Sequence, residues 1–308
     1  MTLTTPLAAL HPRRVVLVHA HPDDESLWTG VTIAHLVAAG VDVHVVTCTL
    51  GEEGEVIPPA LRHLEGRGPA LASHRRTELA RAAAALGVTS HVLGDRGGAG
   101  GGRWRDSGMA GTPAADHPDA LAGGGVAVVD ALADLLGEID PDTVITYEQH
   151  GGYGHPDHVA AHRATHAAVA RLRVAGREVR LLEVVVPRSW AVEDREWLAE
   201  HVHRTEVRVP GADEAFPPSV VPDERVTHVV ADEGALPVQV AALREHPTQV
   251  TVYDGYYALS NGVAARLPGR EAFVLVSVPT PRVAEPSSRA VAALSAAPAP
   301  SVREVSHG

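Results

Sequence analysis

Short apolar runs and helix-spaced apolar positions alternate along the first 170 residues of the chain. Strands are predicted where Val, Ile and Leu cluster, at residues 15–18, 41–49, 88–93 and 142–147. Helices are predicted after each of these runs, at residues 27–39, 74–86, 126–137 and about 158–170. Strands that alternate with helices form βαβ units, so the pattern predicts an α/β fold with a mostly parallel sheet flanked by helices.

The pattern weakens after residue 180. We expect three further strands and one helix there, which would form a smaller C-terminal α+β portion, at residues 181–186, 226–230 and 273–278 for the strands and 235–244 for the helix. The Pro-, Ala- and Ser-rich residues 281–308 have little to bury and are expected to be disordered. A single domain is therefore predicted at residues 14–280, preceded by an N-terminal extension at residues 1–13.

Polar side chains gather directly after three of the predicted strands. The clusters are HAHPDDES at residues 19–26, LGEEGE at residues 50–55 and QHGGYGHPDH at residues 149–158. The carboxyl ends of parallel strands meet at one edge of a sheet, where α/β proteins bind their ligands. Helix capping would explain one acidic residue of the first cluster, but this cluster has two histidines and three acidic residues. We therefore expect a functional site at this edge.

The first and third clusters contain the residue types of a hydrolytic zinc site. Such a site uses about three protein ligands and leaves one position for water, and two imidazoles with one carboxylate are a common set. His21, Asp24 and His158 can provide it. Asp23, beside a ligand but itself free, is then the expected general base. His155, when protonated, is expected to stabilise an oxyanion or to donate a proton to the leaving amine.

The helix after the third cluster offers a second arrangement of ligands. His158, His162 and His166 recur every four residues and share one helical face. A His-x-x-x-His pair binds zinc in many metalloproteases, in which a Glu directly after the first His is the base. Here that residue is Val159. We therefore rank this set below the two-loop site, and expect His162 and His166 to be packing or surface residues.

Composition narrows the chemistry. The chain of 308 residues has a net charge of −12, which argues against a nucleic-acid partner or an anionic membrane surface. All 26 basic residues are arginine, and the lack of lysine excludes Schiff-base chemistry and a P-loop. The only cysteine, Cys48, is expected to be a buried packing residue. Because we find neither a secretory leader nor a membrane-length apolar run, we expect a cytoplasmic protein.

A long polar and glycine-rich segment at residues 94–125 is predicted to be a loop. Within it, GRWRDSGM at residues 102–109 combines fixed charge with an aromatic face. Two interpretations stay open for this stretch: it binds a polar ligand, or it is a solvated loop with its Trp against the surface.

These clusters resemble the motifs of the LmbE/PIG-L family of metal-dependent N-acetylglucosamine deacetylases. The family motif A-H-P-D-D-E matches residues 20–25, and H-P-D-H matches residues 155–158. Runs at residues 47–56, 102–109 and 151–155 are most similar to the family's mycothiol-pathway deacetylases, and the resemblance covers about residues 14–280. It implies a Rossmann-like fold and one catalytic zinc, with Fe²⁺ as an alternative. It also implies an amide hydrolase that converts 1-D-myo-inosityl-2-acetamido-2-deoxy-alpha-D-glucopyranoside into the free amine and acetate.

The resemblance implies the roles already derived: His21, Asp24 and His158 as metal ligands, Asp23 as base and His155 as the charge-stabilising acid. It adds others that spacing could not give. Tyr153 is similar to a mobile tyrosine that polarises the carbonyl, and Asp157 to a partner of His155. Contacts to the hydroxyls of the sugar and inositol would come from Arg75, Glu55 and Asp106. A surface ion pair is the alternative for Arg75 and Glu55. Residues 246–249 are expected to reach toward the active site.

Two other functions stay open. Mycothiol S-conjugate amidases share the motifs, but those relatives tend to have a lysine in the first helix, where this chain has Trp28 and Thr29. A non-enzymatic sugar-binding protein would have no need of the base Asp23. The deacetylase is therefore favoured, with a small pseudo-disaccharide as substrate, and the sequence does not indicate an oligomeric state.

Overall fold

The computed structural model describes residues 5–95 and 102–276 of the chain. Its centre is a nine-stranded sheet in the order β1-β8-β12-β6-β5-β2-β3-β4, with β7 also paired to β6. The strands are β1 Thr5–Pro6, β2 Arg14–His19, β3 Asp42–Thr47, β4 Thr89–Val92, β5 Thr143–Tyr147, β6 Arg180–Pro187, β7 Val220–Val221, β8 His228–Ala231 and β12 Arg270–Val276. The segment from β6 to β4 is wholly parallel, whereas β12 runs antiparallel to both β6 and β8. The predicted α/β fold with a mostly parallel sheet is confirmed.

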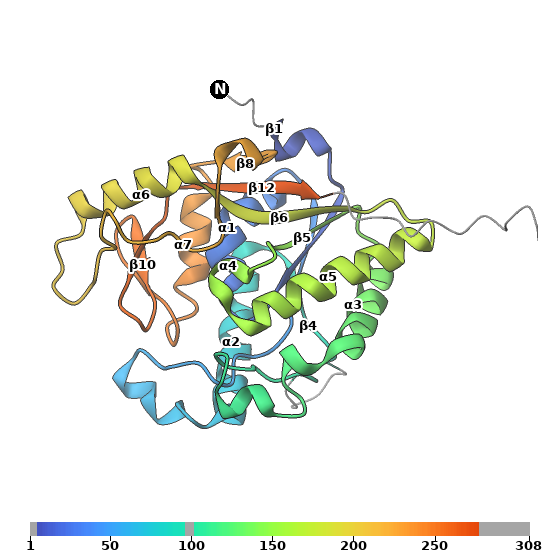
Figure 1. Cartoon of the computed structure of the whole chain (residues 1–308), viewed down its shortest axis with the longest axis horizontal. Helices are drawn as coiled ribbons and strands as arrows, with labels where there is room; N and C mark the ends of the chain where they lie inside the picture. The colour runs from blue at the N-terminus through green and yellow to red at the C-terminus, as the bar shows by residue number, and fades with distance from the viewer. Residues whose placement is uncertain (1–4, 96–101, 277–308) are drawn as a thin grey trace, which may run out of the picture. The chain divides into compact units, whose positions relative to one another are not determined.

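Helices cover both faces of this sheet (Figure 1). On one face α3, Gly125–Ile139, packs against α5, Pro156–Val174. On the other, α1, Asp24–Ala38, packs with α2, Gly68–Leu86, and α7, Leu236–Leu243. The strands between these layers are buried on both sides, as the fully buried residues of β2 show.

The C-terminal portion contains elements that the sequence did not predict. α6, Arg188–His201, follows β6 directly, and it presents only Leu198 to the buried interior. A second sheet of three short antiparallel strands, β9 Thr251–Val252, β10 Tyr256–Ala258 and β11 Ala264–Arg266, lies beside α6 in Figure 1. The predicted disordered tail, residues 281–308, lies outside the described residues, and the predicted domain boundaries stay predictions.

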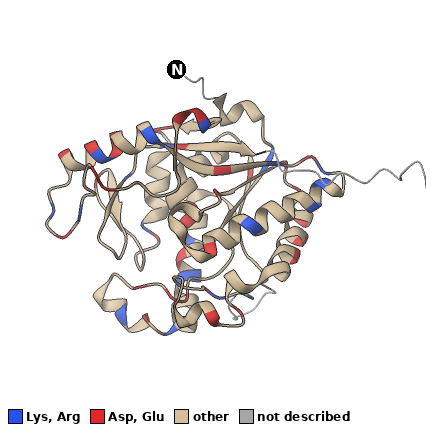
Figure 2. Ribbon diagram, viewed as in Figure 1, with Lys and Arg blue, Asp and Glu red and all other residues tan. Residues whose placement is uncertain are grey.

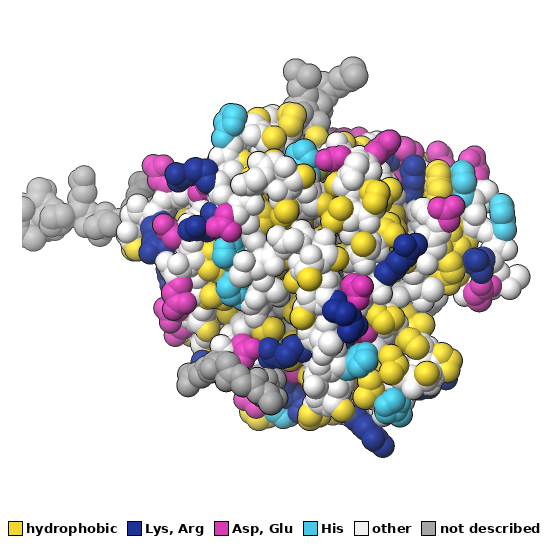
Figure 3. All heavy atoms as spheres, turned by 180° about the vertical axis from the view of Figure 1, so that it is seen from behind, with side chains coloured by type: hydrophobic (Ala, Val, Ile, Leu, Met, Phe, Trp, Pro, Cys, Tyr) yellow, Lys and Arg dark blue, Asp and Glu magenta, His cyan; other side chains and the backbone are white. Residues whose placement is uncertain are grey.

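Residues of both charges are distributed over the elements (Figure 2), and on the reverse face charged side chains are interspersed with hydrophobic ones (Figure 3). No helix within residues 5–95 and 102–276 is long and apolar enough to cross a membrane. Cys48 is fully buried, as expected, and burial raises the pKa of its thiol to about 12.

A partly buried carboxylate connects β12 to α1. The side chain of Glu271 accepts hydrogen bonds from the backbone N–H groups of Val31, at 2.8 Å, and Thr32, at 2.9 Å. Burial raises the pKa of Glu271 to about 7, although these donors favour the charged form. The folded protein therefore holds a proton on this carboxyl at pH values where the unfolded chain has lost it.

Glu271 should make the stability of the protein depend on pH. Its folded pKa lies above the unfolded value of about 4.3, so its contribution is present below that value and is lost as pH rises through about 7. We expect the free energy of unfolding of wild type, minus that of Glu271→Gln, to be about 2 kcal/mol larger at pH 5 than at pH 8. Urea unfolding at the two pH values measures this difference. The exposed Glu233→Gln is the matched control. An equal margin at both pH values would contradict this assignment.

Candidate metal and catalytic site

The three polar clusters meet at one edge of the sheet. They follow β2, β3 and β5, which are neighbours in the order β5-β2-β3 and run parallel. The cluster after β2 leads into α1, and the cluster after β5 leads through the short turn α4, Gly151–Gly154, into α5. Side chains of the first and third clusters contact each other, and the second cluster is linked to them through Arg75 and Asp106.

His21, Asp24 and His158 lie around one point. Their facing atoms are mutually close: His158 Nε2 lies 3.3 Å from His21 Nδ1 and 3.3 Å from Asp24 Oδ2, and His21 Nδ1 lies 3.5 Å from Asp24 Oδ2. Zinc bonds of about 2.0–2.1 Å in a tetrahedron place ligand atoms about 3.4 Å apart. The donor set and its spacing therefore fit one metal ion.

Surrounding groups orient these side chains. Asp24 Oδ2 accepts hydrogen bonds from the Tyr147 hydroxyl, at 2.8 Å, and from the backbone N–H of His21, at 2.9 Å. The other ring nitrogen of His21, Nε2, lies 3.2 Å from Asp157 Oδ2 and 3.6 Å from Asp106 Oδ1. A carboxylate behind a histidine fixes its tautomer and raises its basicity as a ligand. His21 Nδ1 is thereby left free to face the metal position.

The protonation states suit this role. Burial alone raises the pKa of Asp24, but His158 and His21 hold it well below its usual range. Asp24 is therefore anionic at neutral pH, as a metal-binding carboxylate must be. The ring of Tyr147 stacks on His158 with centroids 4.3 Å apart, which restricts the rotation of the imidazole.

Asp23 lies beside these residues in an unusual backbone conformation. Its φ is 117°, a region that residues other than glycine rarely adopt, and its side chain is buried. Burial raises the pKa of Asp23 to about 7, and the nearby guanidinium of Arg75 opposes that shift. A carboxylate with a pKa near neutrality can accept a proton and release it again.

The buried ion pair of Glu25 and His246 supports this backbone conformation of Asp23. Glu25 Oε2 accepts a hydrogen bond of 3.0 Å from the backbone N–H of Asp23, and Glu25 Oε1 lies 2.8 Å from His246 Nε2. Thr248 is held in turn by Glu78, to which its hydroxyl donates. The expectation that residues 246–249 reach toward the active site is confirmed by these contacts.

His155 and Asp157 contact each other differently from the expected carboxylate–imidazole pair. The backbone N–H of Asp157 donates to His155 Nδ1 at 3.2 Å, whereas the Asp157 carboxylate contacts His21 and the backbone N–H of Ser107. Burial, together with His21 and His158, lowers the pKa of His155 to about 4. Because Nδ1 accepts a hydrogen bond, the proton of the neutral ring is on Nε2, which is then a donor.

Tyr153 stands at the rim of the site. Its side chain is 50% exposed, and its ring centroid lies 5.2 Å from that of His158 and 6.1 Å from that of His155. The turn that holds it requires glycine, because a Cβ on Gly151, whose φ is +61°, would come within 2.5 Å of His158 Cβ.

The predicted substrate contacts differ in their surroundings. Arg75 is not in a surface ion pair: it is buried and donates to the carbonyls of Pro22, at 2.6 Å, and Gly51, at 2.9 Å. Asp106 is buried beside His21. Glu55, by contrast, is exposed, and only its backbone carbonyl, which accepts from Gln249, has a described contact.

The helical set does not share one ion. His158 faces Asp24, whereas His162 and His166 face Glu183 of β6, at 3.5 and 2.9 Å. The ring nitrogens of His21, His155 and His158 also fall within 4.8 Å of one another, but the shorter distances favour Asp24 as the third ligand.

Several residues support the cluster through contacts that the sequence did not predict. Tyr147, Glu25 and His246 touch Asp24, Asp23 and Glu25 respectively. Tyr147 and Glu25 adjoin the clusters, so their positions offered a signal. His246 lies 221 residues from Glu25 in sequence, and nothing local indicated the pair.

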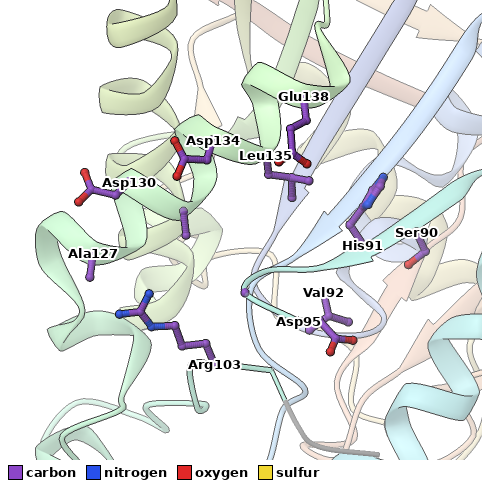
Figure 4. A pocket seen from close by; sticks show the side chains of 12 residues that line it. Ser90, His91, Val92, Asp95, Arg103, Ala127, Asp130, Asp134, Leu135 and Glu138 are labelled. Carbon is purple, nitrogen blue, oxygen red and sulfur yellow. The ribbon is translucent and has the colours of Figure 1, made fainter. Parts of the chain in front are cut away.

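A hollow of about 640 Å³ lies elsewhere, between β4 and α3. Figure 4 shows its lining, which includes His91, Arg103, Asp130 and Asp134. None of the predicted ligands or catalytic residues lines it, so the reaction chemistry is not placed there.

Comparisons with known proteins agree with this geometry. The family model described as GlcNAc-PI de-N-acetylase (PIG-L) matches residues 16–169. A 1D-myo-inositol 2-acetamido-2-deoxy-alpha-D-glucopyranoside deacetylase from Actinosynnema mirum is 47% identical over 91% of this chain and 95% of its own length. The protein of the same name from Acidothermus cellulolyticus is 44% identical over 86% and 89%.

Among solved structures, the hydratase GalB from Pseudomonas putida KT2440 has a TM-score of 0.52 at 17% identity, covering 89% of this chain and 98% of GalB. That likeness concerns the fold alone, because one fold hosts many reactions. The family model and the two relatives establish the family, since the model matches residues 16–169, which include His21, Asp24 and His158, and the relatives match 91% and 86% of this chain. The chain belongs to the GlcNAc-PI de-N-acetylase (PIG-L) family.

Proposed function

We propose that this protein is a zinc-dependent deacetylase of mycothiol biosynthesis that removes the N-acetyl group of 1-D-myo-inosityl-2-acetamido-2-deoxy-alpha-D-glucopyranoside. The observation that carries the proposal is the cluster of His21, Asp24 and His158, with the buried Asp23 directly before Asp24 in the chain and with its charge interacting with that of Asp24. The names of the two close relatives support the substrate. The products are the free amine and acetate, and the reaction is placed in the cytoplasm, with no nucleic-acid or membrane partner.

His21, Asp24 and His158 would hold one Zn²⁺, with Fe²⁺ as the alternative. When bound, the ion supplies a Lewis acid for the amide carbonyl and lowers the pKa of water. Two neutral imidazoles and one carboxylate leave a net positive charge at the centre, which suits the negative charge that develops on the carbonyl oxygen.

Asp23 takes the proton of the attacking water. Its raised pKa makes the carboxylate a base matched to neutral pH, and the hydrogen bond from its backbone to Glu25 holds it in place. After attack, Asp23 can return the proton to the leaving amine nitrogen, so that the neutral amine and acetic acid are formed, and the acid then loses its proton to the amine or to solvent and leaves as acetate.

His155 and Tyr153 stabilise the oxyanion. The neutral ring of His155 donates through Nε2, since its Nδ1 accepts from the backbone of Asp157. Asp157 thereby acts on His155 through its backbone and on His21 through its carboxylate. Tyr153, exposed at the rim, can turn inward and donate its hydroxyl when substrate is bound.

Polar side chains around the opening are proposed to bind the polyol. Asp106, Arg75 and Glu55 combine acceptors with a donor, and hydroxyl groups require both. The guanidinium of Arg75 also donates to the carbonyls of Pro22 and Gly51 and to the Asp23 carboxylate. Arg75 would therefore both position Asp23 and contact the substrate.

Tyr153→Phe should slow turnover without weakening binding. Because the hydroxyl is proposed to act on the oxyanion and the ring is half exposed, we expect kcat to fall by about 10-fold to 100-fold with KM little changed. Steady-state kinetics would check this. Tyr253→Phe is the matched control, because Tyr253 lies between β9 and β10 of the small C-terminal sheet and is not among the proposed catalytic residues. A rise in KM at unchanged kcat would assign Tyr153 to binding instead.

The proposed function is tested by amine release from N-acetylglucosaminyl-inositol and from a mycothiol S-conjugate, assayed side by side with the zinc-loaded protein. Release from the sugar with little from the conjugate is the expected result. The reverse would identify a mycothiol S-conjugate amidase. Chelation should abolish the activity and zinc should restore it; binding of the sugar without hydrolysis under all metal conditions would indicate a sugar-binding protein.

A further inference from the structure

A second group of metal-ligating side chains lies outside the catalytic site. His162 and His166, one turn apart on α5, face Glu183 of the adjoining strand β6. One ligand atom from each of the three lies within 4.8 Å of the other two. The sequence showed the histidine pair but not the carboxylate, which is separated from His166 by 17 residues and reaches it through the packing of α5 on β6.

Both histidines contact the same carboxylate oxygen of Glu183. Glu183 Oε1 lies 2.9 Å from His166 Nε2 and 3.5 Å from His162 Nδ1. Ligand atoms of a tetrahedral zinc ion are separated by about 3.4 Å, so the distance between His166 Nε2 and Glu183 Oε1 is close to that spacing, and His162 would provide its other ring nitrogen, Nε2, after a turn of the ring. The side chain of His162 is 11% exposed, that of His166 26% and that of Glu183 13%. An ion could therefore enter from solvent, although most of the group is shielded.

The tautomer of His162 is compatible with a ligand role. His162 Nδ1 lies 2.9 Å from the carbonyl oxygen of Tyr147, which can only accept, so Nδ1 carries the proton. A hydrogen bond from one ring nitrogen to a backbone carbonyl is the usual support of a metal-binding histidine, and it leaves Nε2 with a free lone pair. Burial lowers the pKa of His162, which keeps the ring neutral near pH 7.

We infer that His162, His166 and Glu183 form a second site for a divalent transition metal such as Zn²⁺, distinct from the proposed catalytic site. Two imidazoles and one carboxylate suit zinc, cobalt and nickel rather than magnesium or calcium. The site is separate because His158, one turn earlier on α5, directs Nε2 toward Asp24 and His21 instead. An ion here would join α5, which carries His158, to β6.

The experiment is equilibrium dialysis of the full chain against buffered free Zn²⁺, with bound zinc measured by mass spectrometry. Wild type should bind about two zinc ions per chain, the second more weakly, whereas His166→Ala and Glu183→Gln should bind about one. Glu183→Gln keeps the size of the side chain and removes only the anionic ligand. A second readout is thermal unfolding: zinc added beyond the first equivalent should raise the Tm of wild type but not of the two variants.

His203→Ala is the control, because His203 is exposed and lies outside both clusters; it should still bind about two ions. The hydrolytic activity of His166→Ala at one equivalent of zinc should match wild type. The inference is overturned if His166→Ala and Glu183→Gln bind as many ions as wild type, whether wild type binds one or two. These outcomes compare wild type with variants at the second site, so they do not depend on whether the proposed catalytic reaction is correct.

Discussion

Asp23→Ala should retain its metal and lose most of its turnover, whereas His21→Ala should lose both. Asp23 lies beside the three proposed ligands and contacts Arg75 and Glu25, so its removal leaves the donor set complete. Loss of a general base typically costs about 10²- to 10⁴-fold in rate. His21 supplies Nδ1 to the metal position, and without it two ligands remain.

Metal content and kcat measured on the same samples check this prediction. Asp23→Asn is the matched variant, because Asn keeps the shape of the side chain and tolerates positive φ better than Ala does. It should also keep the metal and be nearly inactive. Equal metal loss from Asp23→Ala and His21→Ala would show that Asp23 is itself a ligand. Unchanged turnover in Asp23→Asn would remove it from the reaction.

His246→Ala should destabilise the whole chain by about 3–5 kcal/mol, because it leaves the buried carboxylate of Glu25 without its ion-pair partner. Burial alone lowers the pKa of His246, but Glu25 raises it above its ordinary value. The raised pKa means that the stability from this pair is present below about pH 6.5 and is lost as pH rises through the folded value.

Urea unfolding of wild type and His246→Ala at pH 6 and pH 9 measures both effects. The difference between the two proteins should be larger at pH 6. The exposed His203→Ala should differ from wild type by less than about 0.5 kcal/mol at either pH. A cost for His246→Ala as small as that of His203→Ala would mean that the pair contributes nothing to the fold.

Most of the central sheet could be predicted because its strands and helices are long and strongly patterned. α2 begins at Gly68 rather than at His74, since its first turn contains Gly68 and Pro69, which resemble a loop in sequence although proline suits the first turn of a helix. α6 was missed because it buries only Leu198, so it lacks an apolar stripe. The strands of the small sheet have two or three residues, too few for any period to show.

The candidate site could be predicted as far as local clusters reach. His21 and Asp24 follow the end of β2, His158 lies in the first turn of α5 after β5, and the parallel order of the sheet brings these segments together. His246 and Glu183 carry no such signal, because their partners are set by how α7 packs on α1 and how α5 packs on β6. The orientation of the Asp157 carboxylate toward His21 likewise depends on side-chain packing that spacing does not encode.

The backbone strain at Asp23 lowers the stability of the fold. A residue other than glycine with a backbone φ of 117° lowers the free energy of unfolding by on the order of 1–3 kcal/mol relative to a relaxed residue. Glycine would adopt the same conformation without that cost. A lineage selected only for a robust fold would therefore drift to glycine at this position. With Asp23 as the proposed base, the strain at this position is stability that the protein gives up for its reaction.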